Sequence, residues 1–530
     1  MTRVMRTLAV VAALFAIVLY LTSCENRHTV RLAKLSAEQK AADVVYFFEF
    51  VRESYPFLEA MDTEKGLGRF LDLEEVYVER ARTTRSNLEF MALFMEIMQR
   101  VEQGTGHADV AAPLSWSNDR ELDDEIAQYG IGLESFYGQR EWWRLFNEIR
   151  QYRFSDIRVG YSQGNYVTSE DYVTDGVRVP KGSVVLRING LSADEYVRSC
   201  QSRRWLRFDS HLKKPYYSDG TPFVIYGDRD GEPWVVRFRT DVGDTIDCEL
   251  AKTTDLAKVP PRPAPESNLI CRELTENVGY IKVSSFSGPS ARREESRVIR
   301  QFLAQGRDRY GKLILDLRRN SGGSPVYWED NLIRYLIDKP VECVQYAAVK
   351  KGIFDRLEAP FRSTRPAMRS FYDSGEFRKV KRNDLPWTDL SGYFNDTDWY
   401  FFEIRRRYLP VKGFDLSCQV FVLTDNDCFS ATEDFVKTVK QLQLATLVGA
   451  TTLGGAAAFI EPWLFELPNS HIIFTLEIEL AFNSDGKINE IYGTRPDFEL
   501  EPSRYPTSYP TGFSKEELLN DSWIQWVIAR

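Results

Sequence analysis

The apolar and polar positions of the chain change their period twice, and the first stretch has helical spacing. A capping box at Ser36–Gln39 opens a segment of helical periodicity that ends near Glu53. A second box, Ser86–Glu89, opens an apolar stripe that continues to Val101. We therefore expect an N-terminal helical domain over residues 36–152.

Short apolar runs separated by polar turns follow from residue 154 and predict β-strands. In Pro180–Gly190 a glycine turn leads into an apolar strand and then into an Asn-Gly turn. This order is similar to the second half of PDZ domains in secreted bacterial proteases, although any hairpin with a tight Asn-Gly turn has the same pattern. We expect a PDZ-like β-rich domain over 153–255 and a proline-rich linker over 256–266.

The third stretch, residues 267–505, alternates apolar strands with helices. The expected strands are 278–283, 312–317, 419–423 and 445–448, and the expected helices are 290–305, 327–337 and 431–442. This alternation predicts βαβ crossovers, a largely parallel sheet and an α/β fold. The aromatic and charged segment 340–415 is expected to decorate this core or form a lid. A capping box at Ser514–Glu517 predicts a C-terminal helix within 506–530.

The N-terminus has the pattern of a bacterial export signal. Two arginines precede the apolar run Leu8–Leu21, and the following Leu21–Cys24 resembles a lipobox, whose cysteine is lipidated. We expect a lipoprotein signal peptide over 1–24 and a tether over 25–35; the alternative is an uncleaved signal anchor. As a lipoprotein, the chain would be anchored to a lipid bilayer of the cell envelope through Cys24, facing the periplasm or the cell surface.

The composition narrows the possible partners and sites. The net charge of −9 argues against nucleic acid as a partner. The four histidines lie far apart in the sequence, so we expect no metal site, and no motif indicates a cofactor. Apart from Cys24, six cysteines could form disulfides in an oxidising compartment or remain free buried thiols.

Ser430 lies where an apolar strand gives way to a helical pattern. The free N–H groups of the first helical turn would face the same space, so a hydroxyl placed there has oxyanion donors beside it. A serine before a helix is, however, usually an N-cap. Other motifs in the chain decide between a nucleophile and a cap.

The serine is accompanied by several motifs in a fixed order. They are the glycine turn Asp316–Gly323, the helix start Ser430–Glu433, the segment Gly449–Gly455 and the segment Asn489–Asp497. Over about residues 90–505 this order resembles the tail-specific (C-terminal processing) and tricorn-core family of serine peptidases. The resemblance implies a ClpP/crotonase-like protease core with Ser430 as its nucleophile.

The family has two branches, which differ in the base that activates the serine. The processing branch uses a lysine at the position that Gly455 holds here. The tricorn-like branch uses a histidine and a late glutamate, which His107 and Glu490 resemble, and it has a serine where this chain has Gly106. The resemblance implies His107 as general base, oriented by Glu490. A lysine such as Lys487 is the alternative base.

Backbone donors from two motifs are expected to form the oxyanion hole. The candidates are the N–H of Ala431 and that of Gly322 or Gly323. Cys428 lies two residues before the serine, but nothing arranges a base for it, and we expect it to pack in the core.

Together these features predict a cell-envelope serine endopeptidase that cleaves extended or unfolded polypeptide through an acyl-enzyme. Its PDZ-like domain would capture the chain by strand addition. The alternative is a catalytically inactive lipoprotein that binds peptides or small apolar ligands. The oligomeric state does not follow from the sequence.

Overall fold

A computed structural model gives the arrangement of most of the chain. It describes residues 30–63, 66, 68–103, 107–112, 126, 128–149, 153–162, 164–168, 170–174, 176–199, 206–209, 212, 214–216, 222–225, 234–240, 242–250, 252–253, 267–364, 377–414, 416–456, 462–500 and 513–530. The predicted signal peptide with Cys24, the predicted linker 256–266 and Gly106 lie outside the described residues.

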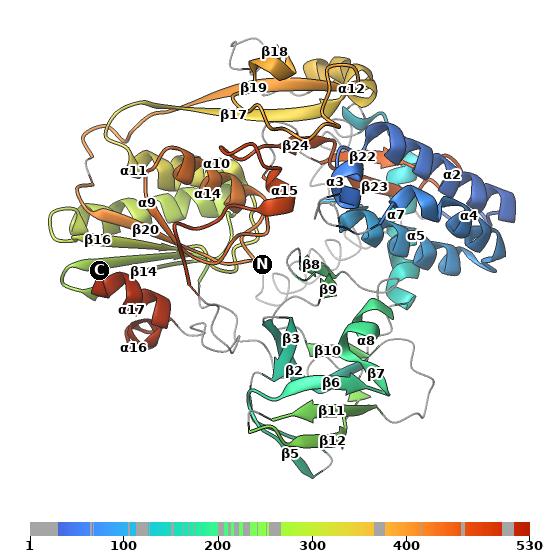
Figure 1. Ribbon diagram of the computed structural model, residues 1–530, viewed down its shortest axis with the longest axis horizontal. Coiled ribbons are helices and arrows are strands. Elements are labelled where there is room, and N and C mark those ends of the chain that lie inside the picture. Colours follow the sequence, from blue (N-terminus) through green and yellow to red (C-terminus); the bar gives the residue numbers. More distant parts are fainter. Residues whose placement is uncertain are drawn as a thin grey trace, which may run out of the picture.

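A six-stranded sheet forms the centre of the α/β core (Figure 1). Its strands in spatial order are β14 (Leu269–Thr275), β15 (Val278–Val283), β16 (Lys312–Asp316), β20 (Gln419–Thr424), β21 (Thr446–Gly449) and β25 (Phe498–Glu499). All neighbours pair in parallel except β14 with β15. The predicted α/β fold with a largely parallel sheet is therefore confirmed.

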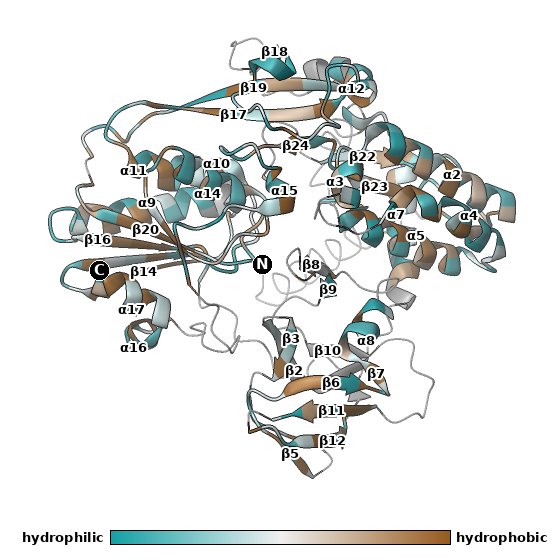
Figure 2. Cartoon of the chain, viewed as in Figure 1, coloured by the Kyte–Doolittle hydropathy of each residue, from teal (hydrophilic) through white to brown (hydrophobic). Residues whose placement is uncertain are grey.

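Helices cover both faces of this sheet, as Figure 1 shows. One face carries α9 (Pro289–Gly306), α10 (Pro325–Trp328), α11 (Arg334–Leu336) and α14 (Ala431–Gln441). The other carries α16 (Lys515–Asn520) and α17 (Ser522–Ala529). Because both faces are covered, the strands are apolar along most of their length, and Figure 2 colours them as predominantly hydrophobic.

The predicted core elements are found within a residue or two of their expected ends, with two exceptions. The expected helix 327–337 is interrupted by a π-helical segment, Glu329–Ile333. The expected C-terminal helix is two helices, because Asp521 accepts hydrogen bonds from the N–H groups of Trp523 and Ile524 and starts a new helix there.

The segment 340–415 supplies most of a second sheet and a helix. In spatial order the strands of this sheet are β18 (Phe377–Val380), β19 (Trp399–Tyr408), β17 (Val341–Lys350) and β24 (Glu479–Ala481), and the helix α12 spans Lys351–Thr364. One apolar cluster joins this sheet to the N-terminal helices, the longest of which are α2 (Ala37–Ser54), α4 (Glu74–Thr83), α5 (Asn87–Glu102) and α7 (Leu133–Ile149). The two predicted capping boxes do start helices, α2 and α5, with Ser36 and Ser86 as N-caps.

A small sheet links the N-terminal part to the end of the chain. The two-residue strand β1 (Asp109–Val110) pairs with β23 (Ile473–Leu476), which also pairs with β22 (Trp463–Glu466). Gln139 of α7 fixes this junction, because its amide donates to the carbonyls of Ala111 and Ile473 and accepts from the Ile473 N–H. Residues more than 360 positions apart thus lie side by side.

A separate β-rich region lies between the helical part and the central sheet in the sequence. Its strands include β2 (Arg153–Ser162), β3 (Asn165–Thr168), β6 (Val184–Ile188), β10 (Pro222–Ile225), β11 (Val235–Arg239) and β12 (Thr245–Glu249). The expected strand, Asn189–Gly190 turn and following helix α8 (Ala193–Ser199) are present, with positive φ at both turn residues. The β-rich character is confirmed, and the PDZ-like assignment stays a prediction.

Four of the cysteines that the structure describes are free thiols: Cys271, Cys343, Cys418 and Cys428. Of the two alternatives left open by the sequence, these four take the second. Among the described residues, no helix combines the length and the apolar character that crossing a membrane requires.

Arg318 of the glycine turn is buried between two carboxylates. Its guanidinium donates to Asp316 Oδ2 at 2.7 Å and to Asp521 Oδ2 at 2.8 Å. Burial alone would raise the pKa of Asp316, but the charges of Arg318 and Lys282 lower it below its usual value. The pairs fix the end of β16 against the C-terminal helices.

Arg318→Met is expected to destabilise the fold by about 3–5 kcal/mol, because it leaves two buried carboxylates without their counter-charge. The free energy of unfolding in denaturant measures this. Arg309→Met is the matched control, since the Arg309–Glu273 pair is exposed and contributes little. Equal stability of the two variants would show that the buried pairs do not hold the C-terminal helices.

Candidate active site

Ser430 has the backbone geometry of a strained junction. It lies between β20 and α14 with φ 56° and ψ −127°, a conformation that non-glycine residues rarely adopt and that concentrates at functional sites. Its side chain makes no capping hydrogen bond to α14. Ser430 thus holds the N-cap position without capping the helix through its side chain, and the hydroxyl is available to another partner.

That partner is His107, whose imidazole lies between Ser430 and a buried carboxylate. Nε2 is 3.1 Å from Ser430 Oγ, and Nδ1 is 2.9 Å from Glu477 Oε2. A carboxylate only accepts hydrogen bonds, so Nδ1 carries the proton and Nε2 accepts from the serine hydroxyl. The Phe429 ring stacks on the imidazole with centroids 4.5 Å apart. The geometry is that of a nucleophile, a base and a group that orients the base.

The carboxylate on His107 is Glu477, not the predicted Glu490. Glu477 is fully buried and directly follows β23. In the β1–β23 register Asp109 lies opposite Thr475, and two more residues of the same antiparallel register bring His107 opposite Glu477. No motif in the sequence pointed to Glu477. Its position beside His107 follows only from the pairing of β1 with β23.

Glu490 nevertheless lies close enough to Glu477 for the two carboxyl groups to interact electrostatically. It lies on α15 (Asn489–Tyr492), is buried, and neither of its carboxyl oxygens has a side-chain hydrogen-bond partner among the described residues. Burial raises the pKa of Glu490 well above its usual value, and the neighbouring Glu477 raises it further. These surroundings favour the neutral form of Glu490.

The glycine turn lies directly against the serine. A Cβ added to Gly322 would be 2.8 Å from the Ser430 Cβ and 3.1 Å from the Ala431 nitrogen, so this close approach requires a glycine. The N–H of Gly322 already donates to Asn320 Oδ1. Within the described residues, the N–H groups of Gly323 and Ala431 donate to no protein acceptor. Of the three predicted donors, these two remain free for an oxyanion.

The space of the processing-branch lysine is filled by Phe429. A Cβ added to Gly455 would overlap the Phe429 ring, and the glycine has φ +82°. Lys487 lies 3.7 Å from Asp485 and beside Tyr492, in a different cavity. Neither position therefore offers a lysine base for Ser430.

Cys428 packs in the core, as expected. Its buried thiol donates to the Leu317 carbonyl at 3.1 Å, and burial raises its pKa well above the usual value. A neutral, inaccessible thiol is a poor nucleophile. Among the residues that the structure describes, no cluster of histidine, cysteine, aspartate and glutamate has the arrangement of a metal site.

Comparisons with known proteins agree with this geometry. The sequence model of peptidase family S41 matches residues 277–500. A search of curated proteins finds no match to the sequence.

Solved structures extend the likeness to nearly the whole chain. The crystal structure of mature CPAF is 14% identical, with 93% of this chain and 98% of that chain covered and a TM-score of 0.54. Mature CPAF complexed with lactacystin is 13% identical, with 93% and 97% covered and a TM-score of 0.52. The photosystem II D1 C-terminal processing protease is 12% identical, with 91% and 97% covered and a TM-score of 0.42.

At these identities the solved structures show the fold, and the family match supplies the class of enzyme. Residues 277–500 include Ser430, Glu477 and the glycine turn. The match assigns residues 277–500 to peptidase family S41, which makes the class of enzyme that of a serine peptidase.

Proposed function

We propose that the protein is a cell-envelope serine endopeptidase with Ser430 as nucleophile, His107 as general base and Glu477 as the carboxylate that orients the base. One observation carries the proposal: the His107 imidazole bridges Ser430 Oγ and Glu477 Oε2 at 3.1 and 2.9 Å. A serine hydroxyl becomes an effective nucleophile only when a positioned base accepts its proton.

The reaction follows from these positions. Ser430 Oγ attacks the carbonyl carbon of the peptide bond while its proton passes to His107 Nε2. The N–H groups of Gly323 and Ala431 hydrogen-bond the resulting oxyanion. The imidazolium, stabilised by Glu477, then gives its proton to the leaving amine, and the acyl-enzyme remains on Ser430. Water activated by His107 hydrolyses this ester by the same steps in reverse order.

Glu490 takes a supporting role in this proposal. A neutral Glu490 keeps a single negative charge behind the imidazole, because two ionised carboxylates buried together would repel each other. The charge that stabilises the imidazolium is then that of Glu477.

The cellular setting and the substrate extend the proposal. The lipobox at Cys24 supports a lipid-anchored protein of the bacterial envelope, and the family supports a polypeptide substrate. An extended or unfolded chain suits a peptidase of this type, because it can add as a strand to an open edge of the β-rich region.

A fluorophosphonate probe tests the nucleophile and the base. The wild type is expected to be labelled, because the probe traps an activated serine. Ser430→Ala is expected to abolish labelling, and His107→Ala to reduce it at least about 1000-fold while the circular dichroism spectrum is unchanged. Labelling that survives His107→Ala would overturn the assignment of the base. A folded wild type that neither labels nor cleaves casein would favour the inactive, ligand-binding alternative.

The two buried glutamates give a second test. Glu477→Gln is expected to lower kcat/KM about 1000- to 10,000-fold, because an amide can hold the wrong tautomer of His107 and no longer stabilises the imidazolium. Glu490→Gln, which mimics the protonated acid, is expected to stay within about tenfold of the wild type. Steady-state cleavage of a fluorogenic peptide measures both. A larger loss for Glu490→Gln than for Glu477→Gln would restore Glu490 as the orienting residue.

A further inference from the structure

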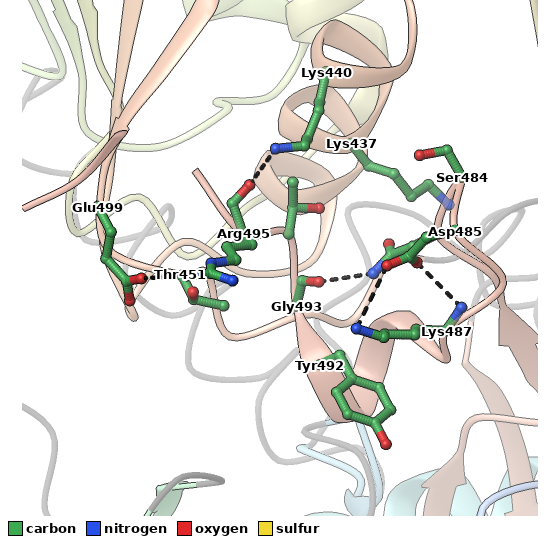
Figure 3. Close-up of a pocket in the computed structure, with 12 residues that line it drawn as sticks. Lys437, Lys440, Thr451, Ser484, Asp485, Lys487, Tyr492, Gly493, Arg495 and Glu499 are labelled. Carbon is green, nitrogen blue, oxygen red and sulfur yellow. Dashed lines mark hydrogen bonds and ion pairs between the residues drawn. The ribbon is translucent and has the colours of Figure 1, made fainter. Parts of the chain in front are cut away.

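A second cavity lies beside α14, away from the reacting serine. Its volume is about 580 Å³, within the range of small-molecule sites. Lys437 lines it from α14, two helical turns beyond Ser430 or roughly 10 Å along the helix axis. Figure 3 shows the Lys437 side chain running from the helix in the direction of the turn that carries Ser484 and Asp485.

Lys437 is unusual for a lysine because it is both buried and without a hydrogen-bond acceptor. Only 3% of the residue is exposed, and its Nζ has no partner among the residues that the structure describes. An ammonium group carries three donors, and burying it unpaired is costly. Its acceptor has to come from outside the described residues, and a bound ligand can supply it.

The other cations of the cavity already have carboxylate partners. These ion pairs are Lys440 with Asp497 at 3.0 Å, Lys487 with Asp485 at 3.7 Å, and Arg495 with Glu499 at 3.1 Å. Lys437 is therefore the one lining cation, within the described part of the chain, that has neither an ion pair nor a hydrogen bond.

Glu433 and Glu490 interact electrostatically with Lys437, but among the described residues neither forms a hydrogen bond with its ammonium group. Glu433 Oε1 accepts from Asn489 and from Thr494, so this carboxyl is held by neutral donors. Burial raises the pKa of Glu433 to about 7 and that of Glu490 well above its usual value. Because burial favours the neutral form of both groups, they offset only part of the ammonium charge.

We propose that this cavity binds the carboxylate of a small organic acid, with the Lys437 ammonium as the charged donor. Thr451 and Ser484 line the same cavity, and their hydroxyl groups are donors for the second oxygen or for polar groups of the ligand. The charge of the single unpaired ammonium group matches that of a carboxylate, which carries one negative charge. A phosphate dianion fits less well, because its second negative charge has no cation to pair with and is repelled by the carboxylates of Asp485 and Glu499.

Isothermal titration calorimetry of the full chain with 4-iodobenzoate tests this site. The expected result is saturable binding of one molecule per chain. The neutral isostere 4-iodobenzamide is expected to bind at least about tenfold more weakly, since it loses the charge-assisted hydrogen bond. Inorganic phosphate at the same ionic strength is expected to bind more weakly than the carboxylate.

Lys437→Met is expected to weaken 4-iodobenzoate binding about 10- to 100-fold. Methionine keeps the length of the side chain and removes only the buried charge, so the fold should persist. Lys515→Met, at an exposed position of α16, is the matched control for the loss of one positive charge and should bind as the wild type does. Should Lys437→Met fail to fold, a wild-type crystal soaked in 4-iodobenzoate decides by its anomalous iodine signal.

Three results would overturn the proposal. They are the absence of saturable carboxylate binding by the wild type, unchanged affinity in a folded Lys437→Met, and iodine located outside the cavity. Tighter binding of phosphate than of 4-iodobenzoate would overturn the assignment to carboxylates.

Discussion

The active-site geometry depends on one short strand pairing. β1 contains only two residues, yet its antiparallel pairing with β23 determines which carboxylate reaches His107. The N-terminal helices hold this pairing: Gln139 bonds to Ala111, directly after β1, and to Ile473 of β23, and Phe47 and Phe94 pack edge-on against Phe474 of β23. His107, the proposed base, lies outside the family-matched segment, and packing and backbone hydrogen bonds, not sequence proximity, bring it to Ser430.

The position of Ser430 depends on a second feature, the close packing of loops at the ends of the parallel strands. The glycine turn after β16 approaches Ser430 so closely that a side chain at Gly322 would collide with it. The turn is held by Asn320, which accepts from the Gly322 N–H and donates to the Val283 carbonyl. Buried charge pairs around Arg318 hold the same strand end. The strain at Ser430 is sustained because the surrounding hydrogen bonds fix its neighbours.

Buried carboxyl groups divide into two kinds in this region. Glu477 has a histidine partner, whereas Glu490 and Glu433 lie in surroundings that favour their neutral forms. Lys437 lies near the neutral kind, which is why its ammonium stays without a strong partner. Burial thus favours the neutral forms of Glu490 and Glu433, and it leaves the Lys437 ammonium without a fully charged carboxylate partner beside the second cavity.

Much of the fold could be predicted from local patterns. The capping boxes at Ser36 and Ser86 and the strand 278–283 were predicted because each depends on neighbours in the sequence. The broken helix at Glu329–Ile333 and the new helix start at Asp521 were missed, since tertiary contacts and a single capping carboxylate decided them. Motif order also singled out Ser430 and His107, which the structure brings within hydrogen-bonding distance of each other; their catalytic roles stay predictions.

The α/β class and the absence of a lysine at position 455 follow from the sequence, because they depend on periodicity and on residue identity. The contact of His107 with Glu477 instead of Glu490 follows only from the folded structure. The sequence alone does not distinguish Glu490 from Glu477 as the partner of His107. The register of β1 on β23 places Glu477 opposite His107. Register is a property of two paired strands, and neither strand's sequence contains it alone.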